Sequence, residues 1–233
     1  MSDLPDPRRH VYRHRPVVPV EQQLVDRHVR AGMQVLDIGT AATGRSAIML
    51  REAGAVVHSI EVNTAAMTEF ATGEDRHGIH LTVADMVALP FAADSFDVVM
   101  IGLHGSDYLV DPAARARAFT ETARTLRPGG ALVFNAFNPA GLALSPSGMT
   151  SPAFLGVRAR YVFSGRFARR TMVDVNGLEL HQAIPRRIVR EVAAATGLRL
   201  ETITNQSGSS TSPLLVGVLA SAPYYVFVDD QSN

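Results

Sequence analysis

A glycine loop follows a short apolar stretch in the first fifth of the chain, in the sequence VLDIGTAATG. Gly39, Ala41 and Gly44 stand at the spacing G-x-G-x-x-G with the middle glycine replaced, and this spacing is typical of dinucleotide-binding loops. Asp37 lies two positions before the first glycine, where its carboxylate would repel a pyrophosphate. The same charge suits a cofactor with a cationic end, such as S-adenosylmethionine (SAM). The loop therefore predicts a nucleoside cofactor, and Asp37 favours SAM over NAD.

Two further carboxylates come at the ends of later apolar stretches. Glu61 ends the stretch VVHSIE and can accept hydrogen bonds from both hydroxyls of a ribose. Asp85 follows IHLTVA and can accept from the exocyclic amine of adenine, with Met86 lying against the ring. A capping role for Glu61 and a turn role for Asp85 are the structural alternatives.

A reaction on a substrate would need further side chains in addition to those that hold the cofactor. The sequence GLHGSDYL, which follows the next apolar stretch, supplies candidates. His104 is a candidate general base, because imidazole titrates near neutral pH, and Asp107 can orient that ring or a cationic amine. Tyr108, Asn135 and His181 are candidate substrate contacts. In the structural alternatives, His104 contacts the cofactor or packs in its loop, and Asn135 caps a loop.

These residues need a scaffold that brings strand ends together. Apolar strands alternate with helices, the strands over 33–38, 55–61, 79–84, 95–103 and 131–137 and the helices over 44–54, 64–72 and 111–127. This alternation predicts crossover connections and a parallel sheet, which binds ligands at the carboxyl ends of its strands. A helix over 185–197 and strands over 198–206 and 222–230 follow.

Two segments depart from this alternation. Residues 1–20 predict an irregular N-terminal arm, from which Tyr12 can fold over the site. Residues 138–184 predict a cover insertion, which is a loop rich in Pro, Gly and Ser followed by a hairpin around Asn176 and Gly177. A surface hairpin without a role is the alternative. Residues 1–233 are predicted to form a single domain.

Residues 35–137 resemble the class I SAM-dependent methyltransferases. The matching pieces are VLDIGTAATGRSA, SIEVN, VADMVALPFAADSFDVVM and TLRPGGALVFNAF, in the family's order. The resemblance implies an α/β fold with a Rossmann-like, seven-stranded, mostly parallel sheet, helices on both faces and an antiparallel last strand. It also implies SAM as cofactor and a small-molecule substrate, as in the bacterial enzymes that methylate metabolites or natural products.

The resemblance implies a role for each matching position. Asp37 would lie near the methionine end of SAM, Glu61 would hold the ribose hydroxyls and Asp85 would border the adenine. The implied cofactor-binding residues are Asp37, Gly39, Thr40, Ala41, Gly44, Glu61, Val62, Ala84, Asp85, Met86, Gly102 and Leu103. The family's common loop is D-x-G-x-G-x-G, so Ala41 replaces its middle glycine and Gly44 comes one residue late. A reshaped loop or weaker SAM binding is expected.

The composition excludes several classes of chemistry. The chain has no cysteine and no lysine, which excludes thiol nucleophiles, thiolate metal sites, Schiff bases and a P-loop. The formal net charge is zero and the apolar runs fall short of about 18 residues, so we expect no nucleic acid, no membrane and a cytoplasmic location. No metal is expected, because no histidines pair at i, i+4 with a carboxylate on a helix. The sequence neither predicts nor excludes a homodimer.

The sequence thus predicts an enzyme that transfers methyl from SAM to an N, O or activated C atom of a small molecule, in secondary metabolism. One alternative is a protein of the same fold that is non-catalytic or does not methylate, which the altered glycine loop permits. The other is an NAD(P)-dependent oxidoreductase, which Asp37 disfavours.

Overall fold

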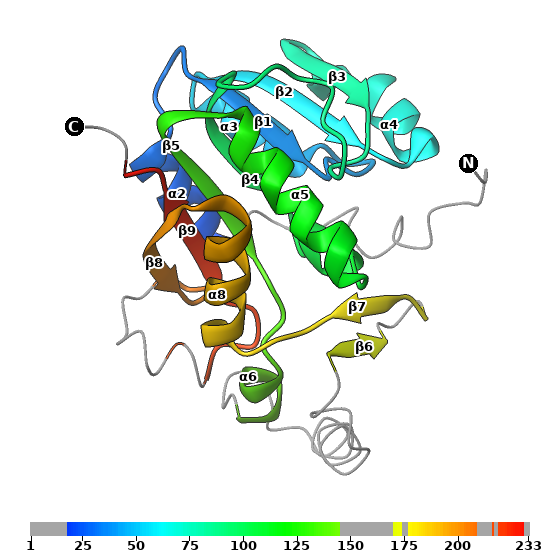
Figure 1. The fold of residues 1–233 in the computed structure, drawn as a ribbon. Helices are drawn as coiled ribbons and strands as arrows, with labels where there is room; N and C mark the ends of the chain where they lie inside the picture. The colour runs from blue at the N-terminus through cyan, green and yellow to red at the C-terminus, as the bar shows by residue number, and fades with distance from the viewer. Residues whose placement is uncertain (1–17, 145–169, 174–176, 209–215, 217–218, 231–233) are drawn as a thin grey trace.

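The chain forms a sheet with helices on both of its faces (Figure 1). The computed structural model describes residues 18–144, 170–173, 177–208, 216 and 219–230. Tyr12 and most of the predicted arm lie outside these residues, as does the middle of the predicted cover. Among the described residues, no helix has both the length and the apolar character that crossing a membrane requires.

The main sheet has seven strands in the order β3-β2-β1-β4-β5-β9-β8. Only β9 runs antiparallel to its neighbours, which confirms the predicted fold class. The chain moves outward from β1 to β3 and then returns to β4, so the topological switch point lies between β1 and β4. The strands are β1 Gln34–Ile38, β2 Val56–Glu61, β3 Ile79–Val83, β4 Phe96–Ile101, β5 Leu126–Asn135, β8 Arg199–Thr204 and β9 Tyr224–Val228.

Helices connect the strands, and five of the six described α-helices begin at a side-chain cap or a proline, α3 (Arg45–Glu52) being the exception. The Asp111 carboxylate accepts hydrogen bonds from the backbone of Ala113 and Ala114, and Asn63 caps the helix that follows it. The α-helices are α2 Pro19–His28, α3 Arg45–Glu52, α4 Thr64–Ala71, α5 Pro112–Thr125, α6 Pro139–Leu144 and α8 Pro185–Thr196. Two short 3-10 helices are η1 Glu74–Arg76 and η2 Gly105–Tyr108.

The sheet separates two hydrophobic cores, because successive side chains of a strand point to opposite faces. Leu132 and Phe134 of β5 pack on the face covered by α5 and α8, together with Phe119 and Ile188. Val133 of the same strand packs on the other face, against residues of α2 and α3. Burial on both faces explains why these strands are almost continuously apolar.

The structure corrects three predicted boundaries. The predicted arm ends earlier than residue 20, since Pro19 and Val20 already belong to α2, where proline fits the first turn. The sequence predicted a loop from residue 138, but α6 begins at Pro139. Helix α5 ends at Thr125 and β5 begins at Leu126, five residues before the predicted start, because Leu126 already pairs with Phe96 of β4.

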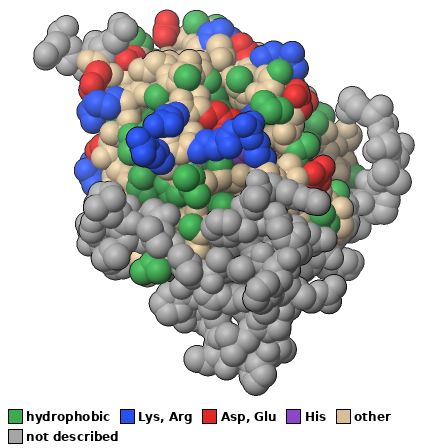
Figure 2. All heavy atoms as spheres, turned by 60° about the horizontal axis from the view of Figure 1, so that its bottom comes forward, with side chains coloured by type: hydrophobic (Ala, Val, Ile, Leu, Met, Phe, Trp, Pro, Cys, Tyr) green, Lys and Arg blue, Asp and Glu red, His purple; other side chains and the backbone are tan. Residues whose placement is uncertain are grey.

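The predicted hairpin forms beside the main sheet. Strands β6 Thr171–Val173 and β7 Glu179–His181 pair antiparallel, and β7 contacts η2 just beyond the carboxyl end of β4. Figure 2 turns the lower end of Figure 1 toward the viewer, and basic side chains gather on this face. The described part of the predicted cover therefore lies near the edge of the sheet where ligands are expected.

Candidate functional site

A cavity of about 300 Å³ lies at the carboxyl ends of β1, β2 and β4, next to the switch point. The candidate substrate residue Tyr108 lines it. The predicted cofactor residues that line it are Gly39, Thr40, Ala41, Glu61, Val62, Ala84, Asp85, Met86, Gly102 and Leu103. Asp37 and Gly44 do not line the cavity: Asp37 binds the lining residues Thr40 and Ser46, and Gly44 lies at the start of α3. The fold therefore brings together residues that are about seventy positions apart in the chain, such as Gly39 and Tyr108.

Asp37 organises the glycine loop from below. It shares the β1 face of Val35, which α3 covers, and its side chain is fully buried. Its carboxylate accepts hydrogen bonds from the hydroxyls of Thr40, Ser46 (2.5 Å) and Ser59 (3.0 Å). Burial raises the pKa of Asp37, and these hydroxyls oppose that shift. Asp37 thus links β1, β2, the loop and α3.

The loop itself makes two left-handed turns in addition to Gly39. Ala41 has a φ of 52°, a conformation that costs an L-alanine roughly 1 kcal/mol or more, and Gly44 has a φ of 58°. A Cβ on Gly44 would lie 2.0 Å from the ring of Phe70, so only glycine fits there. Gly39 has a φ of 82° and open space where a Cβ would be, so a ligand can approach its backbone closely.

Glu61 closes the loop from the neighbouring strand. Its Oε2 accepts from the backbone N–H of Ala41 at 3.0 Å and its Oε1 accepts from that of Asn63 at 2.9 Å. The side chain is buried at the cavity wall with its orientation set by these two bonds. Each carboxylate oxygen has a second lone pair, so both can still accept from a diol.

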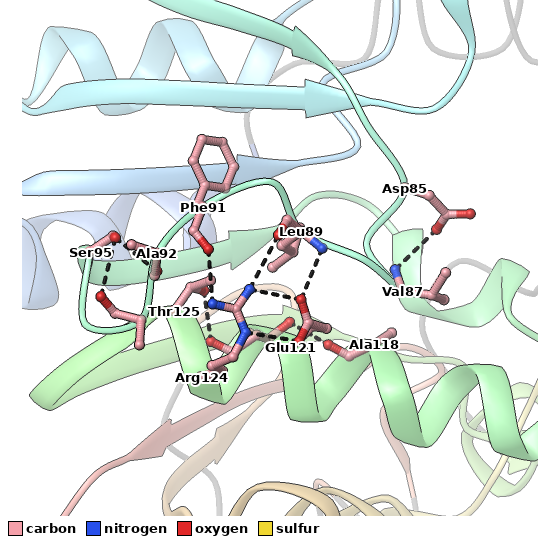
Figure 3. Close-up of polar contacts among 12 residues, drawn as sticks. Asp85, Val87, Leu89, Phe91, Ala92, Ser95, Ala118, Glu121, Arg124 and Thr125 are labelled. Atoms are coloured by element: carbon pink, nitrogen blue, oxygen red, sulfur yellow. Dashed lines mark hydrogen bonds and ion pairs between the residues drawn. The ribbon is translucent and has the colours of Figure 1, made fainter.

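The segment that carries Asp85 and Met86 is held by α5 (Figure 3). Arg124 donates to the backbone oxygens of Leu89 (3.2 Å) and Phe91 (2.8 Å). Glu121 accepts from the backbone N–H of Leu89 at 3.0 Å and also binds Arg124. The bond to Arg124 is the main cause that lowers the pKa of Glu121. This pair fixes the turn after β3 and so places Asp85 in the cavity wall.

A second support of the cavity, formed by Arg45 and Glu21, was not predicted from the sequence. Arg45, the first residue of α3, lines the cavity and pairs with the fully buried Glu21 of α2. Glu21 also accepts from the hydroxyl of Tyr224 at 2.9 Å. Burial is the largest single effect on the pKa of Arg45 and lowers it, but the hydrogen bond and charge of Glu21, together with Tyr224 and Asp37, raise this pKa above its ordinary value. The available signal was Glu21 itself, an acidic residue in what proves to be the first turn of α2.

His104 and Asp107 lie behind the cavity wall and do not line it. His104 Nδ1 is 3.1 Å from Asp107 Oδ2, and its Nε2 is 3.3 Å from the Asn135 amide nitrogen. Asn135 also accepts from the backbone N–H of His104 at 2.8 Å, and the imidazole stacks on Phe137 at 3.7 Å. Both ring nitrogens have partners, so the predicted base role requires His104 to leave Asn135.

His181 does not line this first cavity. Its ring is buried, with Nδ1 4.0 Å from the Asp107 carboxylate, and it lines a second cavity. Of the predicted substrate residues, only Tyr108 therefore faces the first cavity among the described residues. Within the same residues, no group of three or more His, Cys, Asp or Glu side chains is arranged to hold a metal ion.

Sequence comparison identifies a methyltransferase domain. Residues 36–134 match the family described as "Methyltransferase domain". Methyltransferase GfsG of Streptomyces halstedii is 34% identical over 119 residues, which cover 48% of this chain and 40% of the relative. Demethylmenaquinone methyltransferase of Staphylococcus haemolyticus is 30% identical over 156 residues, covering 62% of this chain and 59% of the relative. The chain spans about half the length of the curated relatives it matches.

Solved structures show the same fold over most of this chain. The CcbJ methyltransferase of Streptomyces caelestis superposes with a TM-score of 0.67 at 16% identity, covering 91% of this chain and 90% of that one. A SAM-dependent methyltransferase of Methanosarcina mazei gives 0.66 at 17% identity, covering 88% and 96%. The domain match thus shows a methyltransferase domain over residues 36–134, and the solved structures show that most of the chain shares the fold of SAM-dependent methyltransferases.

Proposed function

We propose that this chain transfers a methyl group from SAM to an N, O or activated C atom of a small molecule. The observation that carries the proposal is the cavity at the switch point, which combines an open glycine backbone at Gly39 with the oriented carboxylate of Glu61. Both features fit a nucleoside with a free ribose diol. The family match supports SAM as that nucleoside.

Each side of the cavity suits one part of SAM. Glu61 would accept from the ribose hydroxyls, and Asp85 would accept from the adenine amine beside Met86. Gly39 and Gly102 would let the methionine end pass close to the backbone. When bound, SAM supplies a methyl group on a sulfonium, which needs an aligned acceptor more than a strong nucleophile.

Two observations support a small-molecule acceptor, namely the cavity wall near η2 and the names of the relatives. Tyr108 and Leu109 line the cavity at its end near η2 and would exclude water from the acceptor. The names of two relatives, a demethylmenaquinone methyltransferase and an O-methyltransferase of Aspergillus nomiae, point to a small molecule and to an oxygen acceptor in those proteins. We also propose that this methyl transfer belongs to secondary metabolism.

One observation favours a second candidate, a protein of this fold that does not methylate. Ala41 holds a left-handed conformation at the position where the family has glycine. Its backbone N–H nevertheless donates to Glu61, so the loop still closes on the ribose side. The loop is therefore reshaped around Ala41 rather than lost, which supports SAM binding.

Calorimetric titration with SAM, S-adenosylhomocysteine and NADH tests the proposal. We expect micromolar binding of both SAM ligands and no heat from NADH. Glu61→Ala should weaken the binding at least tenfold, because two hydroxyls lose their acceptor. The exposed Glu74, outside the cavity, provides the control Glu74→Ala with unchanged affinity. Tight NADH binding with no SAM binding would contradict the proposal, and SAM binding without product in acceptor screens would favour the second candidate.

A further inference from the structure

A second cavity of about 350 Å³ lies between the beginnings of α5 and α8 and the β6–β7 hairpin. Its charged lining consists of Arg115, Arg170, His181, Arg187, Arg190 and Glu191. These side chains come from four separate elements or loops, so the fold and not local sequence gathers them. Basic side chains are grouped on the same end of the molecule in Figure 2.

Arg115 lies at the buried bottom of this cavity, with 1% of its side chain exposed. Its Nε pairs with Glu191 at 2.8 Å, and its Nη1 lies 3.6 Å from Asp107 and donates to the backbone oxygen of Ser106. Its Nη2 has no hydrogen-bond partner among the described residues. A buried guanidinium N–H without an acceptor is costly, so a ligand oxygen in the cavity would satisfy it.

The other arginines of the cavity add charge that no ion pair within the described residues neutralises. Arg187 and Arg190 are three positions apart and share one face of α8, and Arg170 precedes β6. No ion pair or hydrogen bond of these three guanidinium groups occurs within the described part of the chain. Four guanidinium groups thus meet one lining carboxylate, Glu191. Such convergence is typical of sites for carboxylate or phosphate oxygens.

His181 completes the lining as an uncharged group. Burial lowers its pKa to about 4, and the charge of Arg115 lowers it further than the Asp107 carboxylate raises it. Its Nδ1 has no hydrogen-bond partner among the described residues. At neutral pH the ring is therefore neutral and can give one N–H to an anion. A bound anion would in turn offset the arginines and raise the pKa of His181.

The second cavity adjoins the cofactor cavity. Tyr108 and Leu109 line the cofactor cavity, and the next residue, Val110, lines the second cavity together with Pro112. Consecutive Cα atoms are about 3.8 Å apart, so the two walls meet in this segment. A molecule held by an acid group in the second cavity would lie beside the cofactor.

We propose that the second cavity binds the acid group, a carboxylate or a phosphate, of the methyl acceptor. This assignment rests on the proposed function, because it makes the cavity part of the acceptor site. It narrows the acceptor to small molecules that are anionic at neutral pH. Arg115 would bind one oxygen through Nη2, and Arg187 and Arg190 would bind from the surface of α8.

Ring-resolved NMR of the histidines in the full chain tests this proposal, with inorganic phosphate and acetate as probes and chloride holding the ionic strength constant. We expect a saturable shift of the His181 signals and a pKa at least one unit higher in saturating phosphate. The relative affinities for phosphate and acetate indicate which acid group the site prefers. The double variant Arg187→Gln, Arg190→Gln should weaken binding at least tenfold. Arg186→Gln, an exposed neighbour on α8 outside the lining, should stay within twofold.

A second titration uses protein saturated with S-adenosylhomocysteine. Phosphate affinity equal to or higher than that of the free chain supports a separate acceptor subsite. Competition between the two ligands would overturn it, as would a His181 response that is non-saturable or unchanged by the double variant. If S-adenosylhomocysteine itself does not bind, the proposed function fails and with it the acceptor assignment, while the phosphate titration of the free chain still decides whether the cavity is an anion site.

Discussion

Asp37 shows how a single residue acts through its neighbours. The sequence suggested that its charge would face a cationic cofactor, but its oxygens are taken by three hydroxyls from the loop, α3 and β2. Strand alternation places Asp37 beneath α3, and this could be predicted. The hydroxyl partners could not, because Ser59 lies on another strand and only the register of β1 and β2 sets it opposite Asp37.

Replacing Ala41 by glycine should stabilise the chain. Ala41 has a φ of 52°, and glycine adopts this conformation without steric cost. The gain of roughly 1–2 kcal/mol is partly offset by the greater freedom of glycine in the unfolded chain. We expect urea denaturation to show an unfolding free energy higher by about 0.5–1 kcal/mol.

The next residue provides a matched control for this substitution. Ala42 is not among the described residues with a positive φ, so glycine there brings only the cost in the unfolded state. Ala42→Gly should therefore lower the unfolding free energy. Equal effects of the two substitutions would show that Ala41 is not strained.

His181 should make stability depend on pH. Its pKa is about 4 in the folded chain and returns to its ordinary value near 6.5 on unfolding, so acid favours the unfolded state. The contribution is present above pH 6.5 and is lost as the pH falls toward 4. Relative to His181→Gln, the wild type should lose about 2 kcal/mol of unfolding free energy between pH 7 and pH 5.

Denaturation of both proteins in urea at the two pH values measures this difference. Phosphate must be left out of the buffer, because a bound anion would shift the pKa of His181. The other histidines are shared by both proteins and cancel in the comparison. Parallel pH profiles would mean that His181 is not buried in its neutral form.

At the scale of elements, the site depends on helices that lie outside its wall. Helix α5 does not line the cofactor cavity, yet its Arg124 and Glu121 hold the turn that follows β3. The sequence pattern LPF before the fourth strand pointed to a family feature of this turn. The clamp itself was not predicted, because the two segments are more than thirty residues apart.

Arg124→Met should loosen the segment from Ala84 to Phe91. Methionine keeps much of the aliphatic packing and removes the bonds to the backbone oxygens of Leu89 and Phe91. Because Arg124 is about one-third exposed, we expect a stability loss of only about 1 kcal/mol. Hydrogen exchange of this segment should rise and the affinity for S-adenosylhomocysteine should fall several-fold.

Arg117 supplies the comparison for this experiment. It is exposed on the same helix and does not line the cofactor cavity, so Arg117→Met changes charge alone. Exchange in the segment from Ala84 to Phe91 should match that of the wild type. If Arg124→Met leaves this exchange unchanged too, the clamp does not hold the turn.

At the scale of the whole molecule, the sequence predicted the sheet and placed most of the residues that line the first cavity at one edge of it. Strand ends in a parallel sheet meet at one edge, so Gly39, Glu61 and Gly102 could be placed together from their positions alone. The direction of loop side chains could not be predicted, and His104 is turned toward Asn135 rather than into the cavity. The second cavity escaped notice because Arg115 and Arg187 meet only through the packing of α5 against α8.

Strand β9 has a consequence for the order in which the molecule assembles. It follows β8 in the chain but lies between β5 and β8 in the sheet, and its Tyr224 reaches back to Glu21 beside Arg45. During synthesis, β8 therefore leaves the ribosome before the strand that joins it to the sheet. The edge of β5 stays unpaired until β9 arrives, and such an edge can pair with other nascent chains. Completion of the sheet is thus a late step, and the buried support of Arg45 is completed with it.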